Sequence, residues 1–284
     1  MWNLNYDSVK EVISVLESEG LAMSKKFGQN FLIDHNARES IREKIAYKEN
    51  LSAWEIGPGM GAITSLVLNS GIKVKAFEID KGFCRLLKER AFGDEVNFTL
   101  IEGDALKTIS DQSEIPDIIY GNLPYNVGSI IIARLIENSI LPERMVYTLQ
   151  REVVERICAK ENSDDYSSFS ILCQIDYKPT LSVVIRKGCF YPEPQVESAV
   201  VVMEKRKESL VPNDLRETFL EVNRALFSQR RKTIKNNLKA LNLKDIDRVI
   251  ASSNLAGNER AETLSIEKIV EIAKAVNSDK LSSL

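Results

Sequence analysis

Apolar residues recur along this chain in two alternating arrangements. Short segments that suit strands occur at 51–56, 73–78, 96–101, 115–120 and 145–149, and the first and the last two of them are mainly apolar. Segments with helical spacing separate several of these runs, at 62–68, 129–136 and 151–160. This alternation predicts an α/β fold built on a mostly parallel sheet.

Helical spacing also marks the first residues of the chain. Asp7 is a suitable N-cap for a helix that runs to Ser18, and Gly20 is placed to end that helix. A second helix is expected to start near Asn36, before the first apolar run.

The pattern changes twice in the second half of the chain. Two β-branched runs, 181–185 and 199–203, are predicted to pair as an antiparallel hairpin at the edge of the sheet. The polar stretches 205–208 and 212–214 then mark a boundary, beyond which the spacing is helical throughout. We therefore predict a first domain over residues 1–207 and a small all-α domain over 208–284.

Composition and charge narrow the kind of protein. The chain has 284 residues, of which 44% are hydrophobic and 28% charged, as in an ordinary globular protein with a sizeable core. Its net charge of −3 means that nucleic-acid binding has to come from a local patch. Residues 216–248 hold nine basic and four acidic side chains, and a basic helical face is most often only solvated. The cluster in this segment nevertheless suits phosphate contacts; it comprises Arg230, Arg231, Lys232 and Lys235.

Two further features bear on compartment and on metals. Acidic residues interrupt the first apolar segment, and no later run is long enough to span a bilayer, so we expect a cytoplasmic protein without a membrane partner. His35 is the only histidine and cannot form a metal cluster alone. The cysteines lack a C-x-x-C spacing, which favours reduced, mostly buried thiols over a zinc site; they are Cys84, Cys158, Cys173 and Cys189. We expect no metal.

Residues 122–126 carry the most suggestive chemistry. They follow an apolar run and precede a helical segment, so they are expected at the carboxyl end of a strand, where open α/β sheets bind ligands. Asn122 can accept a hydrogen bond from an exocyclic amine, Pro124 restricts the loop, and Tyr125 offers a face for stacking. Taken alone, the stretch is better interpreted as a turn with a half-buried tyrosine, and only a nucleotide-type site elsewhere in the chain would reverse that.

Three strand ends before this loop carry groups suited to a nucleotide-type ligand. Gly57 and Gly59 let the backbone approach a ligand at a helix N-terminus. Glu78 lies twenty-one residues after Gly57, where a Rossmann-like unit places the carboxylate that holds ribose hydroxyls. Asp104 ends the next strand and can accept from an adenine amine. Either acid can instead cap a following helix, but three ligand-type groups at one sheet edge make that alternative weaker.

Two segments allow either a functional or a structural interpretation. Residues 25–34 contain two lysines, a glycine, two amides and two phenylalanines, so they form either a flap over a ligand or a solvated lead-in to a helix. Residues 190–194 are held open by two prolines, so Phe190 is either a second wall opposite Tyr125 or ordinary core.

Taken in their order along the sequence, these motifs resemble those of the small-subunit rRNA adenine N6,N6-dimethyltransferase family, and the resemblance covers nearly the whole chain. The resemblance rests on the segments 28–32, 55–61, 78–80, 103–104, 122–126, 150–153, 190–194, 227–232 and 260–264. Two departures are Arg151, where a lysine is expected, and Tyr191, where a proline or asparagine-like residue is often seen. Neither residue touches the chemistry that the resemblance implies, so they mainly affect the expected phosphate contacts and loop shape.

The resemblance implies a fold and an activity. The fold would be a Rossmann-like class I methyltransferase, with residues 1–35 forming an N-terminal helix and cofactor flap. The activity would be S-adenosylmethionine-dependent dimethylation of two adjacent adenosines near the small-subunit rRNA 3′ end, by a monomer acting on a pre-ribosomal particle. Residues implied at the target base are Asn122, Leu123, Pro124, Tyr125 and Phe190. Residues implied at the cofactor are Gln29, Asn30, Leu32, Gly57, Gly59, Glu78, Asp104 and Asn122. Residues implied at the RNA are Arg151, Arg230, Arg231, Lys232 and Lys235.

Three other functions are compatible with parts of the pattern. A large-subunit adenine methyltransferase of the macrolide-resistance type would share the fold and chemistry, although the 57–59 and 190–194 motifs favour the small subunit. A nicotinamide dehydrogenase would fit the Gly57-x-Gly59-x-x-Ala62 spacing but lacks an obvious acid–base group for hydride transfer. A non-catalytic RNA-binding assembly factor on the same fold is the third.

Overall fold

The computed structural model describes residues 2, 4–21 and 30–281, and the chain divides into two compact units. The first unit contains residues 1–154 and 180–204, and the second contains 155–179 and 205–284. The predicted domain boundary between residues 207 and 208 stays a prediction.

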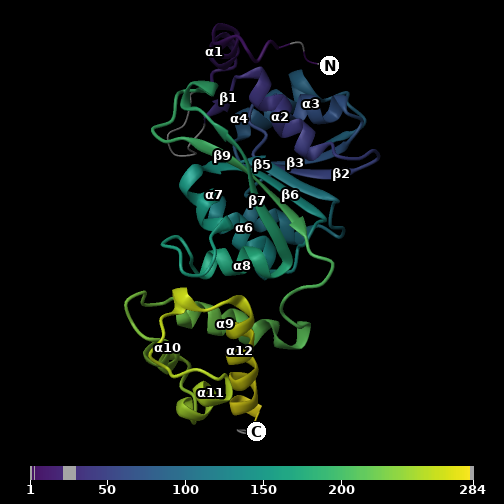
Figure 1. Cartoon of the computed structure of the whole chain (residues 1–284). Coiled ribbons are helices and arrows are strands. Elements are labelled where there is room, and N and C mark those ends of the chain that lie inside the picture. Colours follow the sequence, from purple (N-terminus) through teal and green to yellow (C-terminus); the bar gives the residue numbers. More distant parts are fainter. Residues whose placement is uncertain (1, 3, 22–29, 282–284) are drawn as a thin grey trace. The chain divides into compact units, whose positions relative to one another are not determined.

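A seven-stranded sheet organises the first unit (Figure 1). Its order is β4-β3-β2-β5-β6-β9-β7, and β2 to β6 run parallel while β9 pairs antiparallel with β6. The predicted mostly parallel sheet with an antiparallel edge is thus confirmed. The strands are β2 (Ser52–Ile56), β3 (Lys73–Glu78), β4 (Phe98–Glu102), β5 (Ile118–Asn122), β6 (Arg144–Gln150), β7 (Tyr177–Ile185) and β9 (Ser198–Lys205).

This strand order fixes where a ligand can bind. Going from β2, the chain first adds strands on one side, β3 and β4, and then crosses to the other side with β5 and β6. The order therefore switches between β2 and β5, and a crevice opens at the carboxyl ends of strands on either side of such a point.

Helices cover both faces of the sheet (Figure 1). On one face Ile45 of α2 and Val67 of α3 are fully buried and belong to a core cluster with Val74 and Ile118 of the strands. On the opposite face lies α6, which follows β5 (Figure 1). The helices of this unit after α1 are α2 (His35–Ile45), α3 (Ala62–Asn69), α4 (Lys81–Leu86), α5 (Ala105–Thr108) and α6 (Gly128–Glu137), with a π-helical turn at Leu87–Ala91.

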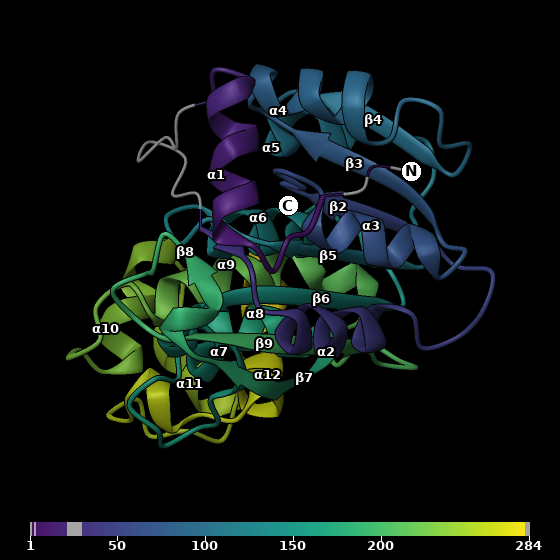
Figure 2. The same cartoon turned by 90° about the horizontal axis from the view of Figure 1, so that it is seen from above.

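The N-terminal helix α1 (Val9–Ser18) packs beside α4 (Figure 2). Its apolar residues, including Val12, form a second core cluster with Met60 and with side chains of α4. The predicted N-cap was one residue early: Ser8 caps the helix by accepting from the backbone N–H of Glu11. Asp7 instead pairs with the buried guanidinium of Arg38, a partner that lies far away in the sequence.

A two-stranded ribbon joins two distant segments of the first unit. Strand β1 (Phe31–Leu32) pairs antiparallel with β8 (Phe190–Tyr191), so that Leu32 lies opposite Phe190. A 3-10 turn at Lys187–Cys189 precedes β8.

The second unit is mainly helical, and its C-terminal helices match the predicted all-α region. Its helices are α8 (Ser168–Asp176), α9 (Arg216–Leu226), α10 (Ile234–Leu238), α11 (Ile246–Ser252) and α12 (Ile266–Leu281), while α7 (Arg151–Cys158) crosses from the first unit. The 3-10 turns lie at Asn213–Leu215, Lys239–Leu241 and Ala261–Thr263. Helix α8 was not predicted; it begins at a capping box in which Ser167 and Ser170 bond each other's backbone N–H. Within residues 2, 4–21 and 30–281, no helix has the length and apolarity needed to cross a membrane.

Candidate active site

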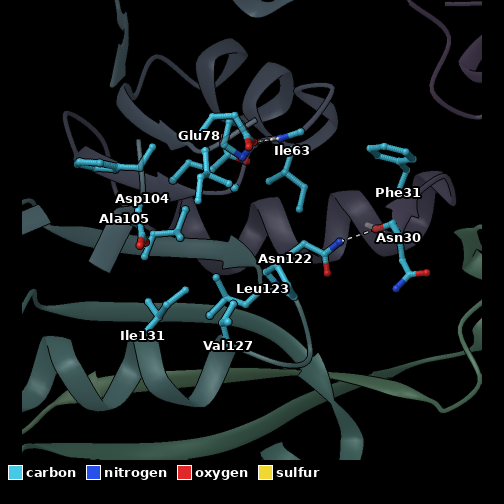
Figure 3. A pocket seen from close by; sticks show the side chains of 18 of the residues that line it. Asn30, Phe31, Ile63, Glu78, Asp104, Ala105, Asn122, Leu123, Val127 and Ile131 are labelled. Carbon is cyan, nitrogen blue, oxygen red and sulfur yellow. Dashed lines mark hydrogen bonds between the residues drawn. The ribbon is translucent and has the colours of Figure 1, made fainter. Parts of the chain in front are cut away.

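A cavity of about 360 Å³ opens where the strand order switches (Figure 3). Its walls come from the segments that follow β2, β3, β4 and β5, together with residues 30–32 at β1. The cavity therefore collects most of the predicted site residues: Asn30, Leu32, Gly57, Gly59, Glu78, Asp104, Asn122, Leu123, Pro124 and Tyr125.

The loop between β2 and α3 forms one wall and depends on glycine. Gly57, Gly59 and Gly61 have φ values of +70°, +56° and +83°, which other residues adopt only with strain. At Gly61 a Cβ would also lie 2.5 Å from the ring of Phe92. The loop can therefore bring backbone N–H groups close to the cavity.

Glu78, at the end of β3, holds this loop in place. Its side chain is buried, and its carboxylate accepts from the backbone N–H of Gly59 at 3.1 Å and from that of Asp80 at 2.9 Å. Burial raises the pKa of Glu78, while the two backbone N–H bonds oppose that rise. Glu78 does not cap the following helix, because the N-cap of α4 is Asp80.

Asp104 caps a helix and also lines the cavity. Its carboxylate accepts from the backbone N–H of Leu106 at 3.0 Å and so caps α5, and the residue also lines the cavity. Two apolar side chains that line the cavity, Ile79 and Leu106, are themselves 48% and 37% exposed. An aromatic ring could lie against them with its polar edge near Asp104.

The loop after β5 lies across the cavity from Glu78 (Figure 3). The side-chain amide of Asn122 donates to the backbone carbonyl of Asn30 with 2.9 Å between the atoms. The backbone N–H of Leu123 donates to the carbonyl of Thr148 on β6, and the carbonyl of Pro124 accepts from the N–H of Gly128. Both ends of the loop are therefore tied to regular structure.

One lining residue was missed by the sequence reasoning. Glu55 of β2 is 2% exposed, and its carboxylate accepts hydrogen bonds from the hydroxyls of Thr64 at 2.6 Å and Tyr120 at 2.9 Å. Burial raises the pKa of Glu55 to about 7, and the nearby Glu78 adds to the rise. An acid inside an apolar run, just before a glycine loop, was the available signal.

The charged side chains that line the cavity are acidic. Its described lining includes three acids, Glu55, Glu78 and Asp104, and no lysine, arginine or histidine. Such a lining suits a ligand that brings its own positive charge, because a buried carboxylate without a cation is costly. S-adenosylmethionine fits these acceptors, because it carries a positive sulfonium and because its ammonium and adenine amine donate hydrogen bonds. A dinucleotide with two phosphates fits them poorly.

One described residue that was predicted at the target base, Phe190, is not among the cavity walls. Phe190 is 3% exposed and packs in the core cluster with α2 and α3, so a stacking role would require it to leave this packing and stays a prediction. Gln29 lies outside the described residues.

The predicted RNA-contacting residues differ in their surroundings. Arg230, Arg231 and Lys232 are exposed in the second unit, and Arg230 donates to the carbonyl of Asp164 at 2.7 Å. Lys235 pairs with Asp247. In the first unit Arg151 pairs with Glu197 at 3.1 Å. Their contact with RNA stays a prediction.

No metal centre forms in the part of the chain that the structure describes. Across those residues, no group of three or more histidine, cysteine, aspartate or glutamate side chains is arranged to hold an ion.

Comparison with known proteins identifies close sequence relatives. The family model described as ribosomal RNA adenine dimethylase matches residues 20–278. The chain is 43% identical to ribosomal RNA small subunit methyltransferase A of Treponema denticola, over 92% of each chain. It is 37% identical to the protein of that name from Borreliella burgdorferi, over 97% of this chain and 96% of the relative.

Solved structures share the fold at lower identity. A dimethyladenosine transferase from Plasmodium falciparum superposes with a TM-score of 0.74 at 23% identity, covering 87% of this chain and 97% of that one. The 23S rRNA methyltransferase ErmE superposes with a TM-score of 0.63 at 19% identity, covering 86% and 98%. These two likenesses bear on the fold alone.

Proposed function

The chain belongs to the ribosomal RNA adenine dimethylase family and is an rRNA methyltransferase, and we propose that its substrate is a pair of adjacent adenosines. In this proposal the N6 amines of both adenosines, in the 3′-terminal hairpin of small-subunit rRNA, each receive two methyl groups from S-adenosylmethionine. The one-sided acidic cavity beside Asn122 is the observation that carries the proposal.

Different residues of the cavity walls would contact different parts of the proposed cofactor. Glu78 would hold the ribose hydroxyls and Asp104 the adenine amine, while Gly57 and Gly59 leave room for the methionine part. Asn30, Leu32, Asn122 and the flap residue Gln29 would complete the site. When bound, S-adenosylmethionine supplies a methyl group made electrophilic by the positive sulfur.

The chain's own contribution to the reaction is alignment. An adenine amine is a poor nucleophile because its lone pair is delocalised into the ring. The side-chain oxygen of Asn122 and the backbone carbonyl of Leu123 would accept its two hydrogens, which draws the nitrogen toward tetrahedral geometry and directs the lone pair. Tyr125 would stack on the base, which has to leave any helical stack to reach the loop. Phe190 is proposed as the opposite wall.

RNA binding is proposed to involve basic side chains of both units. Arg230, Arg231, Lys232 and Lys235 would contact phosphates, with Arg151 as a further contact. We propose that the enzyme acts as a cytoplasmic monomer on rRNA in a pre-ribosomal particle.

Two of the rival functions receive less support than this one. The acidic cavity argues against a dinucleotide-dependent dehydrogenase, since its described lining offers two phosphates acidic side chains and no basic one. The likeness to a 23S rRNA methyltransferase extends to the fold only, whereas the sequence relatives carry the small-subunit name.

The proposal is tested by Asn122→Ala together with mass spectrometry of rRNA. Small-subunit rRNA from cells with the gene is expected to contain paired N6,N6-dimethyladenosines, and rRNA from cells without it is not. Asn122→Ala should abolish methylation and leave RNA binding intact, because the side chain acts on the amine and makes no proposed phosphate contact. Full methylation by this variant would overturn the catalytic assignment, and binding without methylation by the unaltered enzyme would favour a non-catalytic assembly factor.

A further inference from the structure

The hydroxyl of Tyr125 is hydrogen-bonded to a residue outside the cavity. Tyr125 borders the cavity and is half-buried, while its hydroxyl lies 2.6 Å from the hydroxyl of Ser198. Ser198 is not among the lining residues of the cavity. Tyr125 therefore borders the cavity, while its hydroxyl is anchored to a residue that does not.

Ser198 provides a fixed anchor. It begins β9 and is fully buried, and in the antiparallel register it lies opposite Gln150 of β6. Strand β9 has neighbours on both sides, β6 and β7. A hydroxyl at this position moves only with the sheet, whereas the loop that carries Tyr125 is not part of the sheet.

We infer that Ser198 is a positioning residue for methyl transfer: its hydroxyl fixes the plane of the Tyr125 ring against which the target base stacks. The inference rests on the proposed function, in which Tyr125 stacks on the extruded adenine. A phenyl ring alone would supply the stacking face, so the hydroxyl adds orientation and not contact area. Without the anchor the ring can turn about its side-chain bonds, and the amine of a stacked base would less often point along the transfer direction.

The hydrogen bond needs a neutral phenol or a neutral serine as donor, and both are present at physiological pH. Burial raises the pKa of Tyr125 further above its ordinary value of 10.0, so the phenol keeps its proton there. The anchor is therefore expected to act across the working pH range of the enzyme.

A double-mutant cycle tests the inference: Tyr125→Phe, Ser198→Ala and the double variant are compared with the unaltered enzyme. Each single change removes the same hydrogen bond, so each should lower kcat for rRNA methylation by roughly five-fold. The double variant should show the same roughly five-fold loss and not the product of the two, since the bond can be lost only once. The dissociation constant for S-adenosylmethionine and the KM for the cofactor should not change.

Ser52→Ala provides a matched control. It also removes a serine hydroxyl that makes a hydrogen bond on this sheet, to Asp117 at 2.8 Å, but at the first residue of β2, away from the carboxyl ends of the strands. It should lower the unfolding temperature without changing kcat. If Ser198→Ala does not fold, Tyr125→Phe still removes the bond from the other side.

Two outcomes separate failure of this inference from failure of the proposed function. The anchoring role would be refuted if the losses multiplied in the double variant, or if Tyr125→Phe kept full activity. In either case an inactive Tyr125→Ala would still support the stacking role. Full activity of Tyr125→Ala would refute the stacking role itself, and the anchor would fall with it.

Discussion

The side-chain amide of Asn122 donates a hydrogen bond to the backbone carbonyl of Asn30, with 2.9 Å between Nδ2 and the oxygen. This contact joins the loop after β5 to the residue before β1 (Figure 3). A carbonyl accepts and cannot donate, so it selects the amide orientation in which the NH2 group faces Asn30. The side-chain oxygen of Asn122 is thereby left to accept from a substrate amine.

Asn122→Asp tests whether that orientation matters. The carboxylate keeps the acceptor but has no hydrogen to give to the carbonyl of Asn30, so two oxygens would repel each other at this distance. We expect methylation to fall by roughly 100-fold, as when one preorganised hydrogen-bonding group is removed from an active site. Single-turnover methylation of rRNA measures the loss, and the unfolding temperature shows whether the variant is folded. Activity equal to that of the unaltered enzyme would mean that the contact with Asn30 is unimportant for the reaction.

Glu78→Gln is expected to weaken cofactor binding more than catalysis. Both carboxylate oxygens accept from backbone N–H groups, so the NH2 group of glutamine would confront one of those donors. The loss of a charged acceptor should weaken S-adenosylmethionine binding by about 10-fold to 100-fold. Isothermal titration calorimetry measures this change directly.

Glu102→Gln is the matched control for that experiment. Glu102 lies beside Glu78 in the register of β3 and β4, but its side chain is 43% exposed and is not part of the cavity. Its change to glutamine should leave cofactor affinity within about two-fold of the original. Equal weakening in both variants would argue for a general charge effect and against a ribose contact by Glu78.

Glu55 is expected to make stability depend on pH. Its folded-state pKa of about 7 lies above the ordinary value of 4.5, so the folded protein holds this proton over a pH range in which the unfolded chain has lost it. The contribution of Glu55 to stability is therefore fully present below about pH 4.5 and is lost as the pH rises through 7, by roughly 3 kcal/mol in total.

Glu55→Gln should remove that contribution to the pH dependence. Glutamine can still accept from Thr64 and Tyr120 through its oxygen, and it carries no charge to desolvate. The free energies of unfolding of the two proteins, measured without cofactor from pH 5 to pH 8, should diverge progressively in favour of the variant at high pH. Parallel curves over this range would show that the carboxyl of Glu55 titrates normally.

Much of the fold followed from local pattern, and the exceptions have non-local causes. Strand β3 has the predicted ends, Lys73 and Glu78, because it lies between the glycine turn at Gly71 and Asp80, which caps the next helix. Helix α8 was missed because most of its residues are buried, which leaves little polar–apolar contrast along it. The N-cap of α1 was predicted one residue early because Asp7 and Ser8 are both suitable caps. In the folded chain Asp7 forms an ion pair with Arg38 of α2, and Ser8 caps the helix.

The cavity residues could be predicted where their polar side chains lie at the ends of strands. Glu78, Asp104 and Asn122 each end or follow a strand, so the parallel sheet brings them to one edge. The sequence could not choose between the two alternatives for Phe190, because its burial depends on the pairing of β1 with β8, two short strands far apart in the sequence. The partners of Glu55 likewise come from α3 and β5, and only the folded chain brings them together.

The exposed cations of the second unit provide the last prediction. Arg231 and Lys232 lie in the loop between α9 and α10. If each neutralises one phosphate, Arg231→Ala and Lys232→Ala should each weaken rRNA binding uniformly across sequences. Each should also reduce the slope of log affinity against log salt by about 1, because one fewer counterion is released. Filter binding at a series of salt concentrations measures both effects.

Lys268→Ala separates a specific contact from overall charge. Lys268 lies on α12 of the same unit and pairs with Glu271 at 2.7 Å, so its removal changes the net charge by the same amount. A diffuse attraction would lower the affinity and the slope equally in all three variants, because it depends only on the total charge of the unit. Phosphate contacts by the loop require the slope to fall for Arg231→Ala and Lys232→Ala and to stay unchanged for Lys268→Ala.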